Sequence, residues 1–420
     1  MKAILDHVGI AVKDIERALT FYRDALGLEI EPAEEVASQR VRAHIIPAGQ
    51  GALELLEATA PDSPIAKYVE KRGPGIHHVT LRVHDLSATL DHLRARGVRL
   101  IDEQPRSGAQ SSLIAFIHPS SSHGVLVELK QDAQVSFALA SHRLSWGNLE
   151  LVSLHDGLFR LDGGGMFGTV PRPVWEAQTP PDQRHRVLLG MRPLAVEADW
   201  GRMIIDCGVG DKMTVEQQNF YAFDRNRHLD HALADAGFGA EAVDLVLATH
   251  LHFDHVGGAT MREDGSLKPR FPCARYLIRA GEWEEAMHPH QRSRASYRPD
   301  DFLPLKEAEV VDFYEADCEL RPGVRVVRTG GHCPEHQIVF LESAGKTAVF
   351  ASDLIPTTAH IRDTWIMGYD LFPMETLAFK KLFIREAIDR EYLVFFVHDP
   401  LVSAGYIRET QGRRYVEQVL

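Results

Sequence analysis

Two kinds of hydrophobic pattern divide the sequence into a first third and a longer remainder. In the first third, "HVGIAVKDIERAL" begins at His7 and "HVTLRVHDLSATL" begins at His78. In both segments, alternating apolar and polar residues lead into the 3–4 residue spacing of an amphipathic helix, and a glycine closes that helix. Val8 corresponds to Val79, and Leu19 corresponds to Leu90. The pattern therefore predicts two copies of one β-α-β unit.

In each copy, the helix is followed by more sequence with the pattern of strands. The last of these segments contains a glutamate. These segments are "GALELLEAT" and "GVLVELKQ", which place Glu54 and Glu128 at matching positions. A duplicated unit cannot bury its sheet face alone, so we expect the two copies to pack together. Such packing brings His7, Glu54, His78 and Glu128 into one cleft. Two imidazoles and two carboxylates suit one divalent ion with open water positions.

The remainder of the chain contains four continuous apolar runs that each end in a polar residue. Continuous runs are typical of strands covered on both faces, as in an α/β sandwich. The carboxyl ends of neighbouring strands meet at one edge of a sheet, where α/β proteins commonly build sites. We therefore expect the polar residues after these runs to converge at that edge. They are His250 after "AVDLVLAT", His332 after "VRVVRTGG", Asp353 after "KTAVFAS" and His398 after "EYLVFFV".

The segment "HLHFDH" after the first run has the spacing of metal ligands. His250 and His252, two positions apart, point the same way on an extended loop, and Asp254 and His255 begin the next turn. Imidazole and carboxylate groups suit borderline ions such as zinc. We expect His250, His252 and His332 to bind a first ion, Asp254, His255 and His398 to bind a second, and Asp353 to bridge them.

The composition is that of a multidomain globular protein. The chain has 420 residues, of which 45% are hydrophobic and 25% charged, so two or three domains are expected. The boundaries indicated by the patterns are 1–131, a linker or short helix at 132–147, and 148–420. No apolar run reaches the roughly 20 residues of a membrane-spanning helix, so no membrane association is expected.

Charge and cysteine content narrow the possible partners and compartment. The net charge is −13 and no basic run is evident, which argues against nucleic-acid binding and against a nuclease. The four cysteines are widely spaced and form no zinc-ribbon pattern. Together with a first segment that reads directly as a strand, this indicates a reduced, cytoplasmic setting.

Several motifs of residues 4 to 131 resemble the vicinal-oxygen-chelate superfamily, which includes glyoxalase I, and most closely methylmalonyl-CoA epimerases. They are "DHVGIAV", "ELLEA", "DSPIAKYVEKRGPGIHHVTLRV", "RGVRLIDEQPR" and "IAFIHPSSSHGVLVEL". The resemblance implies a paired βαβββ fold and one divalent ion, Co²⁺, Mn²⁺, Zn²⁺ or Ni²⁺. It assigns the ligands His7, His78 and Glu128, with Glu54 where the family has Gln or Glu.

Epimerisation next to a thioester carbonyl needs a Lewis acid for the enolate and two acid–base groups, or one mobile group. Glu128 and Glu54 are the candidates. Some family members carry an additional glutamate on the strand where this chain reads "RVRAHIIP" and has Arg42 and His44 nearby. The identity of the second base is therefore open.

Residues 148 to 415 resemble the metallo-β-lactamase-fold hydrolases through "IIDCG", "THLHFDHVGG", "GGHCPEH", "ASDLIP" and "VHDP". The resemblance implies an αββα sandwich, two Zn²⁺ or similar ions, and hydrolysis of an ester, thioester or lactone, with Asp254 orienting the attacking water. It gives Asp206 and His336 supporting roles, and Cys333 is expected to be a buried bystander.

The segment "DGLFRLDGGGMFGTVPRPVW" is similar to the lactonase-like branch of that superfamily. Lactonases often place a tyrosine shortly after the bridging aspartate, where this chain has Pro356. His360, Tyr369 or Tyr221 is expected to substitute for it.

The sequence therefore predicts a bifunctional metalloenzyme, an acyl-CoA epimerase joined to a dinuclear hydrolase, with small-molecule substrates. A fused glyoxalase I and II pair is an alternative, although the first motifs follow the epimerase pattern and no basic glutathione-binding cluster is evident. A hydrolase with a non-catalytic binding or dimerisation module is another. A homodimer is expected because epimerase relatives pair.

Overall fold

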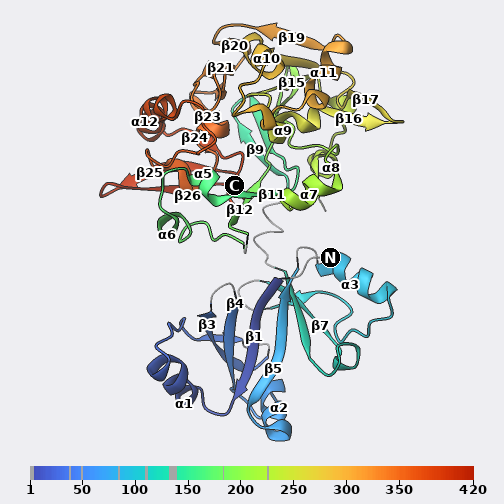
Figure 1. Cartoon of the computed structure of the whole chain (residues 1–420), viewed down its shortest axis with the longest axis vertical. Coiled ribbons are helices and arrows are strands. Elements are labelled where there is room, and N and C mark those ends of the chain that lie inside the picture. The colour runs from blue at the N-terminus through green and yellow to red at the C-terminus, as the bar shows by residue number, and fades with distance from the viewer. Residues whose placement is uncertain are drawn as a thin grey trace. The chain divides into compact units, whose positions relative to one another are not determined.

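The computed structural model describes residues 4–36, 39–48, 51–83, 86–108, 112–131, 140–182, 184–224 and 227–420. The chain divides into two compact units, Met1–Ser136 and Phe137–Leu420 (Figure 1). None of the helices in the described ranges is long and apolar enough to cross a membrane.

The first unit is built from two βαβββ copies, which confirms the predicted fold. Within the described residues they share one eight-stranded sheet in the order β2-β3-β4-β1-β5-β8-β7-β6. The first copy comprises β1 (Ile4–Val12), α1 (Ile15–Leu19) with the π-helical turn η1 (Thr20–Ala25), β2 (Glu34–Val36), β3 (Val41–Ala48) and β4 (Gly51–Ala58). The second comprises β5 (Gly75–Arg82), α3 (Leu86–Ala95), β6 (Arg106–Ser107), β7 (Leu113–Ile117), η3 (Pro119–Ser121) and β8 (Val127–Gln131); α2 (Pro64–Arg72) joins the copies.

Local sequence signals set the helix ends in this unit. The Asp14 carboxylate accepts a hydrogen bond from the Arg17 backbone N–H and caps α1. Ser63 caps α2 in the same way. The apolar side of α1 packs Ile15 and Leu19 on the sheet, as the amphipathic spacing predicts.

Two β-bulges interrupt the central β1–β5 pair. Leu5 is opposite Leu81 and His7 is opposite Thr80, so Asp6 is an extra residue on β1. In the same way, β5 contains one extra residue between the pairs Gly9–His78 and Ile10–Ile76, which is His77. At a bulge, two consecutive side chains can point to the same face of a sheet. Asp6 and His77 accordingly line the same pocket as His7 and His78.

The second unit contains two seven-stranded sheets within the described residues. The first has the order β19-β18-β15-β14-β13-β10-β9 and is formed by β9 (His142–Trp146), β10 (Leu149–Ser153), β13 (Leu194–Ala198), β14 (Gly201–Ile205), β15 (Leu245–Leu247), β18 (Arg275–Arg279) and β19 (Val311–Tyr314). The second follows chain order and is formed by β20 (Cys318–Arg321), β21 (Val324–Arg328), β22 (Gln337–Ser343), β23 (Lys346–Phe350), β24 (Leu393–Phe395), β25 (Ala404–Thr410) and β26 (Arg413–Gln418).

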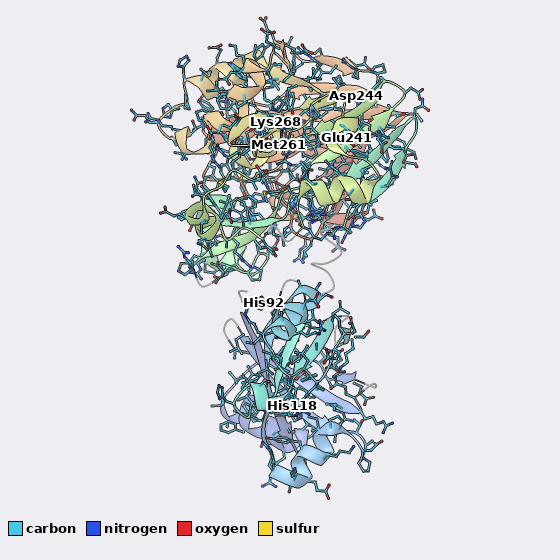
Figure 2. The ribbon with its side chains drawn as sticks, turned by 90° about the vertical axis from the view of Figure 1, so that its right-hand side faces the viewer. His92, His118, Glu241, Asp244, Met261 and Lys268 are labelled. Carbon is cyan, nitrogen blue, oxygen red and sulfur yellow. The ribbon has the colours of Figure 1, made fainter. Side chains whose placement is uncertain are left out.

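Shorter elements surround these sheets. Two hairpins pair β11 (Leu158–Asp162) with β12 (Arg186–Gly190), and β16 (Thr260–Glu263) with β17 (Ser266–Pro269). Met261 and Lys268 are cross-strand partners in the second hairpin (Figure 2). The helices are α5 (Gly163–Phe167), α6 (Arg172–Trp175), α7 (Val215–Tyr221), α8 (Leu229–Ala236), α9 (Phe253–Val256), α10 (Ala280–Met287), α11 (Pro299–Glu307) and α12 (Pro373–Asp389). Single 3₁₀ turns are η4 (Ala240–Ala242), η5 (Gly257–Ala259), η6 (Arg294–Ser296), η7 (Ser352–Leu354) and η8 (Thr358–Ile361).

The layers of the second unit confirm the predicted αββα sandwich. Residues of both sheets, such as Leu151 and Leu341, form one core between the sheets. A second core lies under α8, α10 and α11 on the outer side of the first sheet, and a third lies under α12 on the outer side of the second. Both sheets are therefore covered on two faces, which explains the continuous apolar runs.

The predicted linker 132–147 is wrong over part of its length. Residues 142–146 form strand β9, which pairs with β10 at the edge of the first sheet. Residues 132–139 lie outside the described part of the chain. The short segment "HRLSW" carries a weak alternation, and its pairing with β10 decides its conformation.

Lys380 of α12 is fully buried and gives a testable pH dependence of stability. Its ammonium donates to the Trp365 carbonyl, and burial lowers the pKa of Lys380 to about 7 from 10.5. Between these pH values the unfolded chain holds a proton that the folded chain lacks. The free energy of unfolding therefore rises with pH, by about 1.4 kcal/mol per pH unit from this one group.

Lys380→Met removes this titration and is expected to flatten the slope in that pH range. Urea unfolding of the second unit, followed at several pH values between 7 and 10, measures it. An unchanged slope in the variant would contradict the assignment.

Candidate metal centres

The register of the first sheet brings four polar residues to one face. His7 is opposite Thr80 and Gly9 is opposite His78 in the central pair. On the outer sides of that pair, Glu54 of β4 lies beside Gly9, and Glu128 of β8 lies beside Thr80. The two glutamates thus occupy equivalent places in the two copies, as the repeat predicts.

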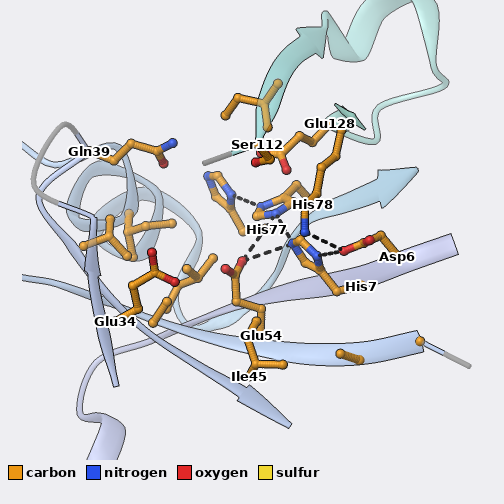
Figure 3. A pocket seen from close by; sticks show the side chains of 18 of the residues that line it. Asp6, His7, Glu34, Gln39, Ile45, Glu54, His77, His78, Ser112 and Glu128 are labelled. Atoms are coloured by element: carbon orange, nitrogen blue, oxygen red, sulfur yellow. Dashed lines mark hydrogen bonds and ion pairs between the residues drawn. The ribbon is translucent and has the colours of Figure 1, made fainter. Parts of the chain in front are cut away.

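His7, Glu54 and His78 form a cluster whose ligand atoms all lie within 4.8 Å of one another. Glu54 Oε2 is 3.2 Å from His7 Nε2 and 3.7 Å from His78 Nε2, and the two imidazole nitrogens are 3.3 Å apart (Figure 3). Three donor atoms that converge in this way are suited to one divalent cation.

Each bulge residue is hydrogen-bonded to the histidine that follows it. Asp6 Oδ1 accepts from His7 Nδ1 at 2.7 Å, on the side of the ring away from Glu54 (Figure 3). His77 Nδ1 is 2.9 Å from His78 Nδ1. Such contacts leave the Nε2 atoms for the cluster and fix the orientation of both rings. The sequence interpretation missed both partners, although Asp6 directly precedes the ligand in the quoted motif.

Gly9 is required by the close packing of His78. A Cβ atom at this position would lie 2.3 Å from the His78 ring. In the other copy the equivalent residue is Thr80, and its hydroxyl is 3.0 Å from His7 Nε2. The two ligand histidines therefore have different surroundings despite their equivalent positions.

Glu128 is not part of the three-residue cluster. Its Oε1 accepts a hydrogen bond from the Thr80 hydroxyl at 3.3 Å, and its side chain lines the same pocket as His7 and His78. Burial raises the pKa of Glu128 to about 7. A carboxyl group with this pKa exchanges protons readily near neutral pH.

These residues lie in a pocket of about 320 Å³. Lys130 and Arg82 line it near His7, and both form ion pairs with Asp6. Two other histidines of the unit, His92 and His118, do not line this pocket; Figure 2 labels both. The pocket therefore combines one cation-binding cluster with separate acidic and basic side chains.

The second unit brings its seven predicted ligands together, but they come from two sheets. His250 and His252 follow β15 of the first sheet, whereas Asp353 follows β23 of the second. The expectation of one edge of a single sheet is therefore wrong, because apolar runs identify strands and not the sheet to which each belongs. From the second sheet, His332 follows β21 and His398 follows β24; Asp254 and His255 lie on α9.

The seven side chains form two groups, each with ligand atoms within 4.8 Å of one another. His332 Nε2 is 3.0 Å from His252 Nδ1 in the first, and His398 Nε2 is 3.2 Å from His255 Nε2 in the second. Their members are His250, His252, His332 and Asp353 in the first group, and Asp254, His255 and His398 in the second.

Asp353 contacts both groups. Its Oδ2 is 3.0 Å from His332 Nε2 and 3.5 Å from His255 Nε2, and its Oδ1 is 3.2 Å from His398 Nε2. One carboxylate therefore lies between the two sets of imidazoles. This is the position that the sequence analysis gave to a bridging ligand.

The polar atoms of these groups fit the binding of cations. His250 Nε2 is buried and has no hydrogen-bond partner among the described residues. Buried polar atoms are normally paired, so this unpaired nitrogen needs an explanation. Burial also lowers the pKa of His250 and His252 well below the usual range, which keeps both rings neutral, as ligands must be.

Hydrogen bonds behind the ligands fix their orientation. Asp206 accepts from His255 Nδ1 at 2.8 Å and from the Thr249 backbone N–H, and His398 Nδ1 donates to the Gly190 carbonyl. His336 Nε2 accepts from the Asp353 backbone N–H at 3.1 Å. Asp206 and His336 thus lie where supporting residues were expected.

Asp370 has a comparable place that the sequence interpretation missed. It accepts from His332 Nδ1 at 3.0 Å and from the Thr376 hydroxyl at 2.7 Å. No spacing rule connects it to His332, from which it is separated by 38 positions.

Of the three candidates for a substrate-contacting side chain, His360 is already engaged. It is buried, its Nε2 donates to the Met166 carbonyl, and its ring stacks on Phe167. Tyr221 packs against Phe253, next to Asp254, and is only partly buried. Tyr369 is 40% exposed. The two tyrosines remain the candidates.

Comparison with known families agrees with the division into two units. Residues 6–116 match the Glyoxalase/Bleomycin resistance protein/Dioxygenase superfamily, and residues 195–398 match the Metallo-beta-lactamase superfamily. The mitochondrial methylmalonyl-CoA epimerase of Mus musculus is 35% identical over 128 residues, which are 30% of this chain and 72% of that protein.

The second unit is similar to known hydrolases. The N-acyl homoserine lactonase of Bacillus thuringiensis is 26% identical over 217 residues, 49% of this chain and 79% of that protein. The crystal structure of a probable metal-dependent hydrolase from Staphylococcus aureus superposes with a TM-score of 0.61 and 29% identity, over 66% of this chain and 100% of that chain.

Proposed function

We propose that this chain, which belongs to the glyoxalase/bleomycin resistance protein/dioxygenase superfamily in its first unit and to the metallo-beta-lactamase superfamily in its second, is a bifunctional metalloenzyme. The first unit epimerises an acyl-CoA such as methylmalonyl-CoA. The second hydrolyses an ester, a thioester or a lactone at a dinuclear site.

The separation of Glu128 from the ligand cluster supports the epimerase activity. His7, Glu54 and His78 would hold the ion, and Glu128 lies in the same pocket with a pKa near 7. A bound divalent ion supplies stabilisation of the negative charge that develops on the thioester oxygen. Glu128 takes the proton from the carbon next to that carbonyl, and a second acid group of the pocket returns a proton to the opposite face of the same carbon, which inverts it.

The position of Asp353 between two ligand groups is the observation that carries the hydrolase proposal. Two bound ions supply an activated water and stabilise the oxyanion. Asp254 orients that water from the second group, and Asp353 keeps the two groups at a fixed separation. Tyr221, which packs against Phe253, or Tyr369 contacts the carbonyl substrate.

Metal analysis combined with two assays on the purified full chain tests the proposal. We expect about three ions per chain, two of them Zn²⁺ or similar in the second unit, together with α-proton exchange of methylmalonyl-CoA in D₂O and hydrolysis within an ester, thioester and lactone panel. His78→Ala should remove only the exchange, and His250→Ala should remove only the hydrolysis.

Other results would contradict the proposal in distinct ways. About two ions and hydrolysis without exchange would make the first unit a binding or dimerisation module. Efficient turnover of lactoylglutathione through both units would favour the glyoxalase pair.

A further inference from the structure

We propose that Glu282 of α10 is a positioning residue that holds together the two loops carrying His250, His252 and His332. The inference rests on the proposed dinuclear hydrolase site and adds a residue to which no role has been assigned. Glu282 is 1% exposed and is not a member of either ligand group. Its carboxylate acts on the ligands through residues that flank them in the chain and through Tyr297, which packs on one of them.

Each carboxylate oxygen of Glu282 contacts a different ligand loop. Oε1 accepts from the backbone N–H of Leu251 at 2.8 Å, and Leu251 lies between His250 and His252. Oε2 accepts from the Cys333 thiol at 3.3 Å, and Cys333 directly follows His332. The Glu282 side chain therefore connects the backbone between His250 and His252 with Cys333, the residue that follows His332.

Tyr297 adds a third contact. Its hydroxyl donates to Glu282 Oε1 at 3.1 Å, and its ring lies edge-on to the His252 ring with 4.7 Å between centroids. A single backbone bridge also joins His252 and Tyr297. Glu282 thereby fixes the residue against which one ligand imidazole packs.

The sheet topology explains why such a clamp is needed. The loop with His250 and His252 follows β15, and the loop with His332 follows β21, which belongs to the other sheet. The strand ladders of the described residues do not join these two loops. Yet His332 Nε2 and His252 Nδ1 must stay 3.0 Å apart to share an ion.

The burial of a carboxyl group at this place argues for a dedicated role. Removing such a group from water is unfavourable unless hydrogen bonds compensate. Glu282 receives three hydrogen bonds, and each comes from a residue of, or in contact with, a ligand loop. Cys333, expected from the sequence to be a bystander, is one of these donors.

The test is the number of strongly held ions in the full chain, measured by dialysis against a chelator. Glu282→Ala is expected to lower the affinity of one ion by about 10–100-fold, as for other residues that orient ligands, and to reduce the count from about three to about two. Glu282→Gln should restore it, because its amide oxygen still accepts from Leu251 and Tyr297 and its amide N–H can donate to the Cys333 sulfur. Glu284 is an exposed residue of the same helix, so Glu284→Ala is the matched control.

A double variant identifies which group is affected. If Glu282 supports the group of His250, adding His398→Ala to Glu282→Ala leaves one ion, in the first unit. If the double variant keeps two, the proposal is wrong. Should Glu282→Ala fail to fold, Tyr297→Phe is the substitute. It removes one of the three hydrogen bonds to Glu282 and must also weaken the binding of the ion at the group of His250.

The two hypotheses fail separately. A wild-type second unit that binds no ions refutes the hydrolase proposal itself. A wild-type unit that binds two ions, with unchanged affinity in Glu282→Ala, refutes only the clamp.

Discussion

Replacing Asp353 by asparagine is expected to lower the hydrolase activity by more than about 100-fold, because outer-shell changes alone cost 10–100-fold and Asp353 contacts both ligand groups directly. The substitution keeps the size of the side chain and removes the negative charge shared by the two sites. Affinity for both ions should fall, in contrast to the loss of one ion in Glu282→Ala. Metal content and the initial rate on the best substrate of the panel measure the effect.

Asp312→Asn is the matched control for this prediction. Asp312 is an exposed residue of β19 whose carboxylate pairs with Arg275, and it belongs to neither ligand group. Its replacement should leave metal content and rate unchanged. An Asp353→Asn variant that keeps a near-normal hydrolysis rate and two ions in the second unit would show that the bridging role of Asp353 is wrong.

Replacing Glu128 by glutamine is expected to reduce α-proton exchange by about 10²–10⁴-fold, the usual contribution of a positioned acid–base group. The first unit should keep its ion, since His7, Glu54 and His78 are unchanged and Glu128 lies outside their cluster. In the wild type, exchange should rise as the pH increases through the pKa of Glu128, because only the ionised carboxylate accepts the proton. This rise should be missing in the variant.

Two comparisons make the Glu128 prediction specific. Glu103→Gln, at an exposed position where the carboxylate pairs with Arg94, should leave exchange and its pH profile unchanged. Hydrolysis by the second unit should be the same in all three proteins. Loss of the ion in Glu128→Gln would instead make Glu128 a ligand, as the family resemblance implied.

The features that the sequence predicted are those set by local spacing. The repeat around His7 and His78 predicted the paired βαβββ fold because hydrophobic periodicity marks strands and helices directly. The "HLHFDH" segment indicated candidate ligands because two-residue spacing places side chains on one side of an extended loop. The positions of His332 and His398 followed from the same strand-end pattern.

The features that the sequence did not predict depend on contacts between distant segments. Periodicity does not show which sheet a strand joins, so the placement of β15 and β23 in different sheets was missed. Asp370 and Glu282 have no sequence motif and act through hydrogen bonds that only the folded chain creates. Glu128 lies on a strand that the pattern predicted. Its position outside the ligand cluster depends on the conformation of its side chain, which a sequence pattern does not give.

The two bulges in the β1–β5 pair have an evolutionary consequence. Asp6 and His77 are each one residue more than the ladder needs, so an in-frame deletion of either codon leaves His7 or His78 on its original face. A lineage can therefore gain or discard the hydrogen-bonding partner of one histidine without sacrificing the histidine. The two copies carry the bulge at equivalent positions, and it holds an acidic partner in one copy and an imidazole partner in the other.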